Sequence, residues 1–202
     1  MGHEQRFMYM VAQTFNESIE VFKKHPVPWI LIGLVVMVVG GMIPILGGLI
    51  LLPGVVREGR ASIEGDRAPD VGALFNGIGN DIGPMFLYGL AQIVIGTVTC
   101  GLGAPVVWIL LWYSVEAAAD GRVEAPDALR VSLQWTKRNL ADTIMMALAC
   151  SFIATLGATL TCGLGIIVVT PFIFIMWTVH WMKIREDVYA IAEQNGITVA
   201  PA

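Results

Sequence analysis

Long uncharged stretches alternate with short charged ones along this chain. The stretch from Thr143 to Met182 holds forty residues without Asp, Glu, Lys or Arg, and similar runs cover residues 25–56 and 82–115. One helix over forty residues would be about 60 Å long, roughly twice the thickness of the hydrocarbon core of a bilayer. Each run is also interrupted near its middle by a glycine-rich segment. The pattern therefore predicts an all-α integral membrane protein with about six transmembrane or re-entrant helices, arranged as three hairpins.

Short motifs recur in the same order and indicate an internal repeat. Thr-Cys-Gly-Leu-Gly stands at residues 99–103 and 161–165, in the middle of two uncharged runs, and Ala-Pro-Asp precedes both runs. The first run has Gly-Gly instead, and its legs of about 15 residues are shorter than the ~20 that a full span needs, so a re-entrant hairpin is the alternative there. We expect one membrane domain over residues 1–194, with repeats at about 4–60, 69–120 and 126–188, and a flexible cytoplasmic tail over 195–202.

Amphipathic segments precede the hairpins. Helical spacing over residues 4–24 places five apolar side chains on one face: Phe7, Val11, Phe15, Ile19 and Phe22. After Pro126-Asp127, a second helix has an apolar face of Leu129, Leu133, Thr136 and Leu140. We expect such helices to lie in the cytoplasmic membrane interface. We also expect residues 57–70 to form a polar connection, and the last helix to continue past Lys183 in water to about Gln194.

Composition and charge support the membrane assignment and give an orientation. The chain is 56% hydrophobic and only 14% charged, and its net charge of −4 comes from clusters of both signs, which excludes a basic surface for nucleic acid. With three hairpins, all twelve Lys and Arg residues fall on one side of the membrane. The positive-inside rule then places both termini in the cytoplasm, in a bacterial inner membrane.

Three polar residues in or near the uncharged runs form a candidate intramembrane site. Glu116 is flanked by Val115 and Ala117, but it lies four residues from Asp120, where a carboxylate can reach water. His180 has a comparable place on the last leg and could pair with Glu116 or sit at the interface. Gln92 lies deeper, where its amide needs a partner from another helix or a second subunit.

Small residues at helical spacing predict close helix packing, either between legs of the chain or between subunits. The first legs of the first two hairpins carry glycine pairs, and the leg from Ala147 carries a row of small residues. These positions are Gly33, Gly40, Gly89, Gly96, Ala147, Ser151, Ala154 and Ala158.

Cysteines occupy equivalent turns of the second and third hairpins. Cys100 and Cys162 fall on the predicted non-cytoplasmic side, where an oxidising periplasm allows a disulfide, although cysteine also serves as a small apolar turn residue. No metal site or cofactor is expected, because the cysteines and histidines lack the close spacing of a zinc site. Enzyme signatures such as Gly-x-Ser-x-Gly or a phosphate-binding Gly-Lys-Ser/Thr loop are absent from the sequence.

One group of proteins resembles the second half of this chain. Trp135 to Asn139 enters an uncharged run that continues through Cys162-Gly163-Leu164-Gly165 to Pro171. This layout resembles uncharacterised bacterial polytopic inner-membrane proteins and is similar to the membrane domain ahead of some bacterial glycerophosphodiester phosphodiesterases. The resemblance implies a helical inner-membrane fold with interfacial helices. It carries over no catalytic residue, because the phosphodiesterase part has no counterpart here.

The sequence favours a non-enzymatic membrane protein that acts by assembly, as a homo-oligomer or as an accessory subunit of a larger membrane complex. The alternatives are a small channel or transporter, with Gln92, Glu116 and His180 along its path, and a lipid-binding or membrane-shaping protein. The expected partners are membrane lipids and other membrane subunits, and not nucleic acid.

Overall fold

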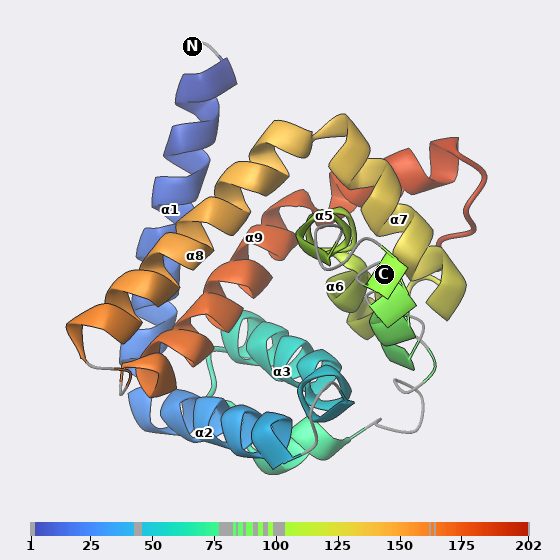
Figure 1. Ribbon diagram of the computed structural model, residues 1–202. Helices are drawn as coiled ribbons and strands as arrows, with labels where there is room; N and C mark the ends of the chain where they lie inside the picture. Colours follow the sequence, from blue (N-terminus) through green and yellow to red (C-terminus); the bar gives the residue numbers. More distant parts are fainter. Residues whose placement is uncertain are drawn as a thin grey trace.

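The computed structural model describes residues 3–42, 46–76, 83, 85–86, 88–90, 93–94, 97–98, 104–161, 163 and 165–201 (Figure 1). This part of the chain is 84% helix and contains no strand, which confirms the all-α prediction. The elements in chain order are α1 (His3–Lys24), α2 (Pro26–Met42), α3 (Leu46–Gly65), η1 (Gly72–Phe75), α5 (Ala104–Leu110), α6 (Ser114–Asp120), α7 (Ala125–Arg138), α8 (Leu140–Leu160) and α9 (Ile166–Gln194).

Helix α9 is the centre of the fold, because it contacts α1, α2, α3, α7 and α8. Figure 1 shows it running through the middle of the molecule, with α8 beside it and α2 and α3 on another side. One face of α9 completes an apolar cluster with α2, α3 and η1, to which it contributes Ile175 and Val179. A second face, including Trp177 and Trp181, packs into a larger aromatic cluster with α6, α7 and α8.

Two helices are long and apolar enough to cross a membrane, namely α8 and α9. A third candidate arises if Met8–Lys24 and Pro26–Val39 are taken as one broken element, although the two helices meet at 101°. The bend falls at His25, where Pro26 and Pro28 follow, since proline lacks an amide donor and restricts the residue before it. The chain is therefore a membrane-associated helical protein with two or three candidate spans among its described residues.

Close approach between α2 and α9 occurs where α9 contains a proline. Pro171 lacks the amide that would bond to the carbonyl of Ile167. A Cβ placed on Gly33 would lie 2.6 Å from Pro171 Cδ and 2.9 Å from Ile167 O, so only glycine fits there. Gly157 plays the same role between α8 and α9, since its Cβ would lie 2.3 Å from Val169 Cγ2. These two glycines set the distances between legs of the chain.

The expected polar connection over residues 57–70 is wrong in its first half, because α3 remains helical to Gly65. The polar side chains on this extension find partners on neighbouring elements. Arg57 donates to the carbonyl of Asn76 and Arg60 to that of Ala119, at 2.6 and 3.0 Å. These contacts hold the helix against η1 and α6 beyond the end of the uncharged run.

Helix α7 ends earlier and buries a different face than the one predicted. It stops at Arg138, and Leu140 begins α8 with its side chain exposed. Thr136 is buried as expected, but Leu129 and Leu133 are only half-buried. The buried face comprises Ala128, Val131, Ser132, Trp135 and Thr136. The face is rotated because α7 packs against α5, α8 and α9 of its own chain rather than only on a membrane surface.

The end of α9 is a packed helix rather than a water-exposed one. It ends at Gln194 as predicted, but Ile184, Val188, Tyr189 and Ala192 are buried in the aromatic cluster. The tail that we expected to be loosely held contacts the rest of the chain. Ala200 donates its amide to the carbonyl of Arg122 at 2.8 Å, and Ile197 is buried.

A bulkier residue at position 33 should separate α2 from α9. We expect Gly33→Ala to lower the free energy of unfolding by about 1–3 kcal/mol, the usual cost of overpacking a tight contact. The measurement is thermal unfolding of the detergent-solubilised protein. Leu34→Ala is the control, since Leu34 is an exposed neighbour on α2 and its truncation should change the melting temperature little. Equal melting temperatures for Gly33→Ala and the wild type would contradict the α2–α9 contact.

Candidate functional site

Glu116 is a fully buried carboxyl group on the short helix α6. Its exposed fraction is 0%, so the expectation that this carboxylate reaches water is wrong. Thr178 of α9 donates its hydroxyl to Glu116 Oε1 over 3.4 Å. The other oxygen, Oε2, has no hydrogen-bond partner within the described part of the chain. Helix α6 brings the carboxyl group inward because Ser114, Val115 and Ala117 around it are buried too.

Burial controls the charge of this carboxyl group. Helix α6 lies outside the candidate spans, and desolvation there raises the pKa of Glu116 to about 8. The charge of Arg60 and the Thr178 hydrogen bond act in the opposite direction, but they do not compensate for the loss of water. Glu116 is therefore predominantly neutral at pH 7.

Arg60 makes its direct ionic contact with Asp120 and not with Glu116. Its guanidinium forms a salt bridge with the Asp120 carboxylate, and the two side chains are only 15% and 3% exposed. Tyr189 of α9 donates its hydroxyl to the other oxygen of Asp120 at 2.7 Å. This buried pair joins α3, α6 and α9.

Further ion pairs extend this network. Together, the pairs Arg60–Asp120, Arg122–Glu186 and Arg185–Glu64 form what we call the charged end of the molecule. The guanidinium of Arg122 lies 4.4 Å from the centre of the Tyr189 ring and 3.1 Å from Glu186 Oε1. Arg185 reaches Glu64 of α3 at 3.2 Å. Charged side chains from α3, α9 and the α6–α7 loop are thus paired with one another.

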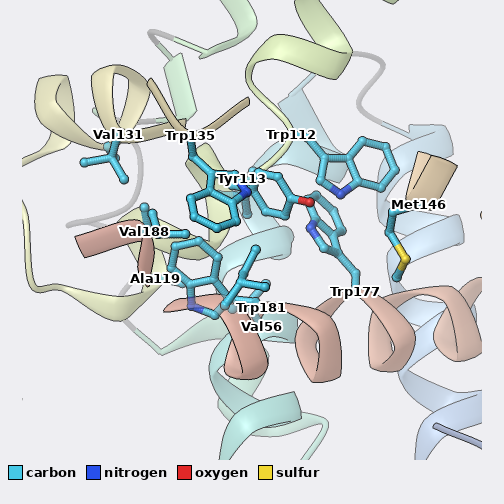
Figure 2. Packing of buried hydrophobic residues seen from close by; sticks show 14 of the residues in the cluster. Val56, Trp112, Tyr113, Ala119, Val131, Trp135, Met146, Trp177, Trp181 and Val188 are labelled. Carbon is cyan, nitrogen blue, oxygen red and sulfur yellow. The ribbon is translucent and has the colours of Figure 1, made fainter. Parts of the chain in front are cut away.

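His180 pairs with Tyr113 and not with Glu116. The Tyr113 hydroxyl and His180 Nε2 are 3.1 Å apart, and both side chains are buried. Figure 2 shows Tyr113 in the middle of four tryptophans, Trp112, Trp135, Trp177 and Trp181. Ser132 of α7 fixes the turn before α6, because it accepts the Tyr113 amide at 3.1 Å and donates to the Leu110 carbonyl at 3.0 Å. The site is therefore a closed polar pair inside an aromatic cluster.

The structure places only part of the candidate intramembrane site. Glu116 and His180 lie on facing elements, α6 and α9, each bonded to a different partner. Gln92 lies outside the described residues, as do Cys100, Cys162 and Gly96. Cys150 is a free, buried cysteine. Among the described residues no group of three His, Cys, Asp or Glu side chains could hold a metal ion.

The predicted packing residues occupy different surroundings. Gly33 contacts α9, Gly89 is buried and Gly40 lies within α2. On α8, Ala147 is buried, Ala154 and Ala158 are half-buried and Ser151 is exposed. The row of small residues therefore runs from the core toward the outer surface of α8 instead of facing one neighbour throughout.

Sequence reasoning missed Arg60, Asp120 and Thr178 as partners. Arg60 lies in the expected polar connection over residues 57–70 and Asp120 at the end of an uncharged run, where paired and free charges look alike in a sequence. Thr178 precedes His180 by two residues and carries no charge, so nothing marked it. A signal did exist in the short distance between Glu116 and Asp120, which share one turn of α6.

Breaking the buried Arg60–Asp120 pair should destabilise the protein strongly. We expect Asp120→Asn to cost about 3–5 kcal/mol, because Arg60 would keep a buried charge without its partner. Asp127→Asn is the matched control, since it removes a carboxylate that pairs with the exposed Arg130 and should cost at most about 1 kcal/mol. Chemical denaturation of both variants in detergent gives the comparison, and similar losses in the two would rule out a special role for the buried pair.

Glu116 should make stability depend on pH. Its pKa is about 8 in the folded protein and about 4.5 when exposed, so the folded state binds more protons between these values. The free energy of unfolding should therefore be fully retained below about pH 4.5 and fall, by roughly a few kcal/mol, as the pH rises toward 8. Glu116→Gln should reduce this slope, whereas Glu124→Gln, at an exposed position, should leave it unchanged. Melting temperatures from pH 5 to 8 provide the measurement, and an unaltered slope in Glu116→Gln would refute the assignment.

Comparisons with known proteins identify no relative of this chain. No family model, curated protein or solved structure matches the chain. Its function is therefore inferred from the buried cluster, the charged end and the exposed apolar faces of the helices.

Proposed function

We propose that this chain is a non-enzymatic protein of the bacterial inner membrane that acts by assembly, through the outer face of α8, with a second copy or with a larger membrane complex. In this proposal the three hairpins supply six spans or their re-entrant equivalents, and both termini lie in the cytoplasm. The observation that supports it most directly is that the rest of the chain covers only a small part of α8.

Helix α8 is a candidate span with an unusually open surface. Only 22% of its most apolar window is buried inside the protein, compared with 44% for α9. Its outward side is a largely apolar strip, whose exposed large side chains are Met145, Leu148, Phe152, Leu156 and Leu160. Such a face requires lipid or another protein around it.

Small polar residues interrupt this strip and favour another helix as its neighbour. Ser151 and Thr155 are exposed on α8, one turn apart, and Thr155 donates its hydroxyl to the Ser151 carbonyl at 2.8 Å. Small residues on a spanning helix let a second backbone approach closely, and the Ser151 hydroxyl can bond across such a contact. A surface that met only acyl chains would not require either feature.

The charged end supports the proposed orientation. The ion pairs between α3, α6 and α9 gather charged residues from several parts of the chain at one end of the helices. A one-sided distribution of Lys and Arg is typical of the cytoplasmic side of a membrane protein.

A channel or transporter has less support from the described residues. Glu116 and His180 are 0% and 1% exposed and lie inside a packed cluster. Two grooves on the surface of the described part of the chain, between α1 and α9 and between α1 and α8, are lined by other residues. Neither groove therefore connects the two buried polar groups to solvent.

Native mass spectrometry of the detergent-purified protein tests the proposal. We expect a discrete oligomer or a defined heavier complex, and we expect Ser151→Leu to weaken assembly by about tenfold, the effect of losing roughly 1.4 kcal/mol of helix contact. Val27→Leu, which enlarges an exposed residue on α2, is the control and should leave assembly unchanged. A monomer that carries only lipids, or equal assembly of the wild type and Ser151→Leu, would overturn the proposal.

A further inference from the structure

An amphiphilic groove on the charged side of α1 has the chemistry of a lipid headgroup site. It has a volume of about 690 Å³ and is formed by the second half of α1, Ile63 of α3 and three residues of α9, namely Val179, Met182 and Lys183. This volume falls within the range of about 300–1,000 Å³ that small-molecule sites commonly have. The groove is separate from the buried cluster around Glu116.

The position of the groove coincides with the end of a candidate span. Val179 and Met182 are among the last residues of the uncharged run of α9, and Lys183 is the first charged residue after it. Lys23 and Lys24 end α1 immediately before the apolar helix α2. The groove therefore lies where hydrocarbon gives way to headgroups, the depth at which a lipid places its phosphate.

The floor and the rim of the groove differ in polarity. Val179 is buried, and Val21 and Ile63 are half-buried, so the floor offers apolar contact. The exposed apolar face of α2 begins at Val27, three residues after Lys24, and provides a surface for acyl chains. A ligand with a charged head and apolar chains satisfies both parts.

The rim carries charges of both signs. Lys183 lies 2.8 Å from Glu17, and Lys23 lies 3.4 Å from Glu20. Lys24 also faces the groove and pairs outside it with Asp66, at 2.5 Å. Three ammonium groups and two carboxylates thus border one groove.

The Lys23–Glu20 pair can exchange partners at little cost, because the two side chains are 67% and 71% exposed and an ion pair so open to water contributes little to stability. The Lys183–Glu17 pair is less exposed, at 22% and 43%. A phosphate between Lys23 and Lys183 would form stronger, charge-assisted hydrogen bonds. The carboxylates of Glu17 and Glu20 would then be free to accept an ammonium group.

We propose that this groove binds the headgroup of a zwitterionic phospholipid that carries both a phosphate and an ammonium group, as phosphatidylethanolamine does. Lys23 and Lys183 hold the phosphate, and Glu20 and Glu17 hold the ammonium group. An anionic headgroup without an ammonium, such as phosphatidylglycerol, meets the same lysines but also the two carboxylates. The mixed rim therefore selects the zwitterion.

Native mass spectrometry after exchange into an equimolar mixture of phosphatidylethanolamine and phosphatidylglycerol tests this site. The wild type should retain phosphatidylethanolamine in preference. The double variant Lys23→Gln/Lys183→Gln should retain about fivefold less of it, the loss expected when charge-assisted contacts worth about 1 kcal/mol disappear. Lys137→Gln removes an exposed lysine on α7 and should retain as much lipid as the wild type.

A second variant separates selective binding from loss of folding. Glu20→Gln removes a carboxylate that is largely exposed, and it should shift the retained lipid from phosphatidylethanolamine toward phosphatidylglycerol. A misfolded protein would not exchange one preference for the other. Equal retention of both lipids by the wild type, equal losses in Lys137→Gln and the double variant, or an unchanged ratio in Glu20→Gln would each overturn the proposal.

Discussion

The packing of α9 against five other helices is the interaction on which the rest of the structure depends. Residues on different sides of this helix enter two separate apolar clusters, so that Ile175 belongs to one and Met176 to the other. Helices α2 and α3 on one side and α7 and α8 on the other therefore share one central element, α9. The contact between Gly33 and Pro171 shows how closely α2 packs against α9, since a single added carbon at position 33 would meet the proline ring and the Ile167 carbonyl.

Burying charged side chains in this helical framework costs desolvation energy, and the ion pairs between them partly offset that cost. Arg60 and Asp120 are nearly buried, and such a pair contributes little net stability compared with apolar residues of the same volume, although losing one partner is expensive. The pair links α3 to α6 at one defined position, and Tyr189 adds a hydrogen bond from α9 to the same carboxylate. Glu116 differs from its neighbours because it is buried without a full set of partners and is therefore predominantly neutral. A neutral acid, a bonded Tyr113–His180 pair and four tryptophans make this region a buried, closely packed centre among the described residues.

The outer surface has two regions of different polarity. The exposed strip of α8 is apolar with small hydroxyl residues, whereas the groove beside the second half of α1 combines an apolar floor with paired charges. A contact between spanning helices suits the first surface, and a phospholipid headgroup suits the second. The two proposals concern different faces of the protein, so a lipid held beside α1 would leave the α8 strip free for a partner.

The sequence by itself determined the helical class, the apolar segments and most of the breaks between helices. The ends of α1 at Lys24 and of α9 at Gln194, and the bend before Pro26, follow from local chemistry: charge, periodicity and proline act within a few residues. Only the tertiary structure decided which charges are buried and with whom. Arg60, Asp120 and Tyr189 are separated by 60 and 69 positions in the chain, so their contact depends on how α3, α6 and α9 pack. The same reason explains the rotated face of α7, the buried end of α9 and the burial of Glu116, because a residue's environment is set by neighbours that no local pattern contains.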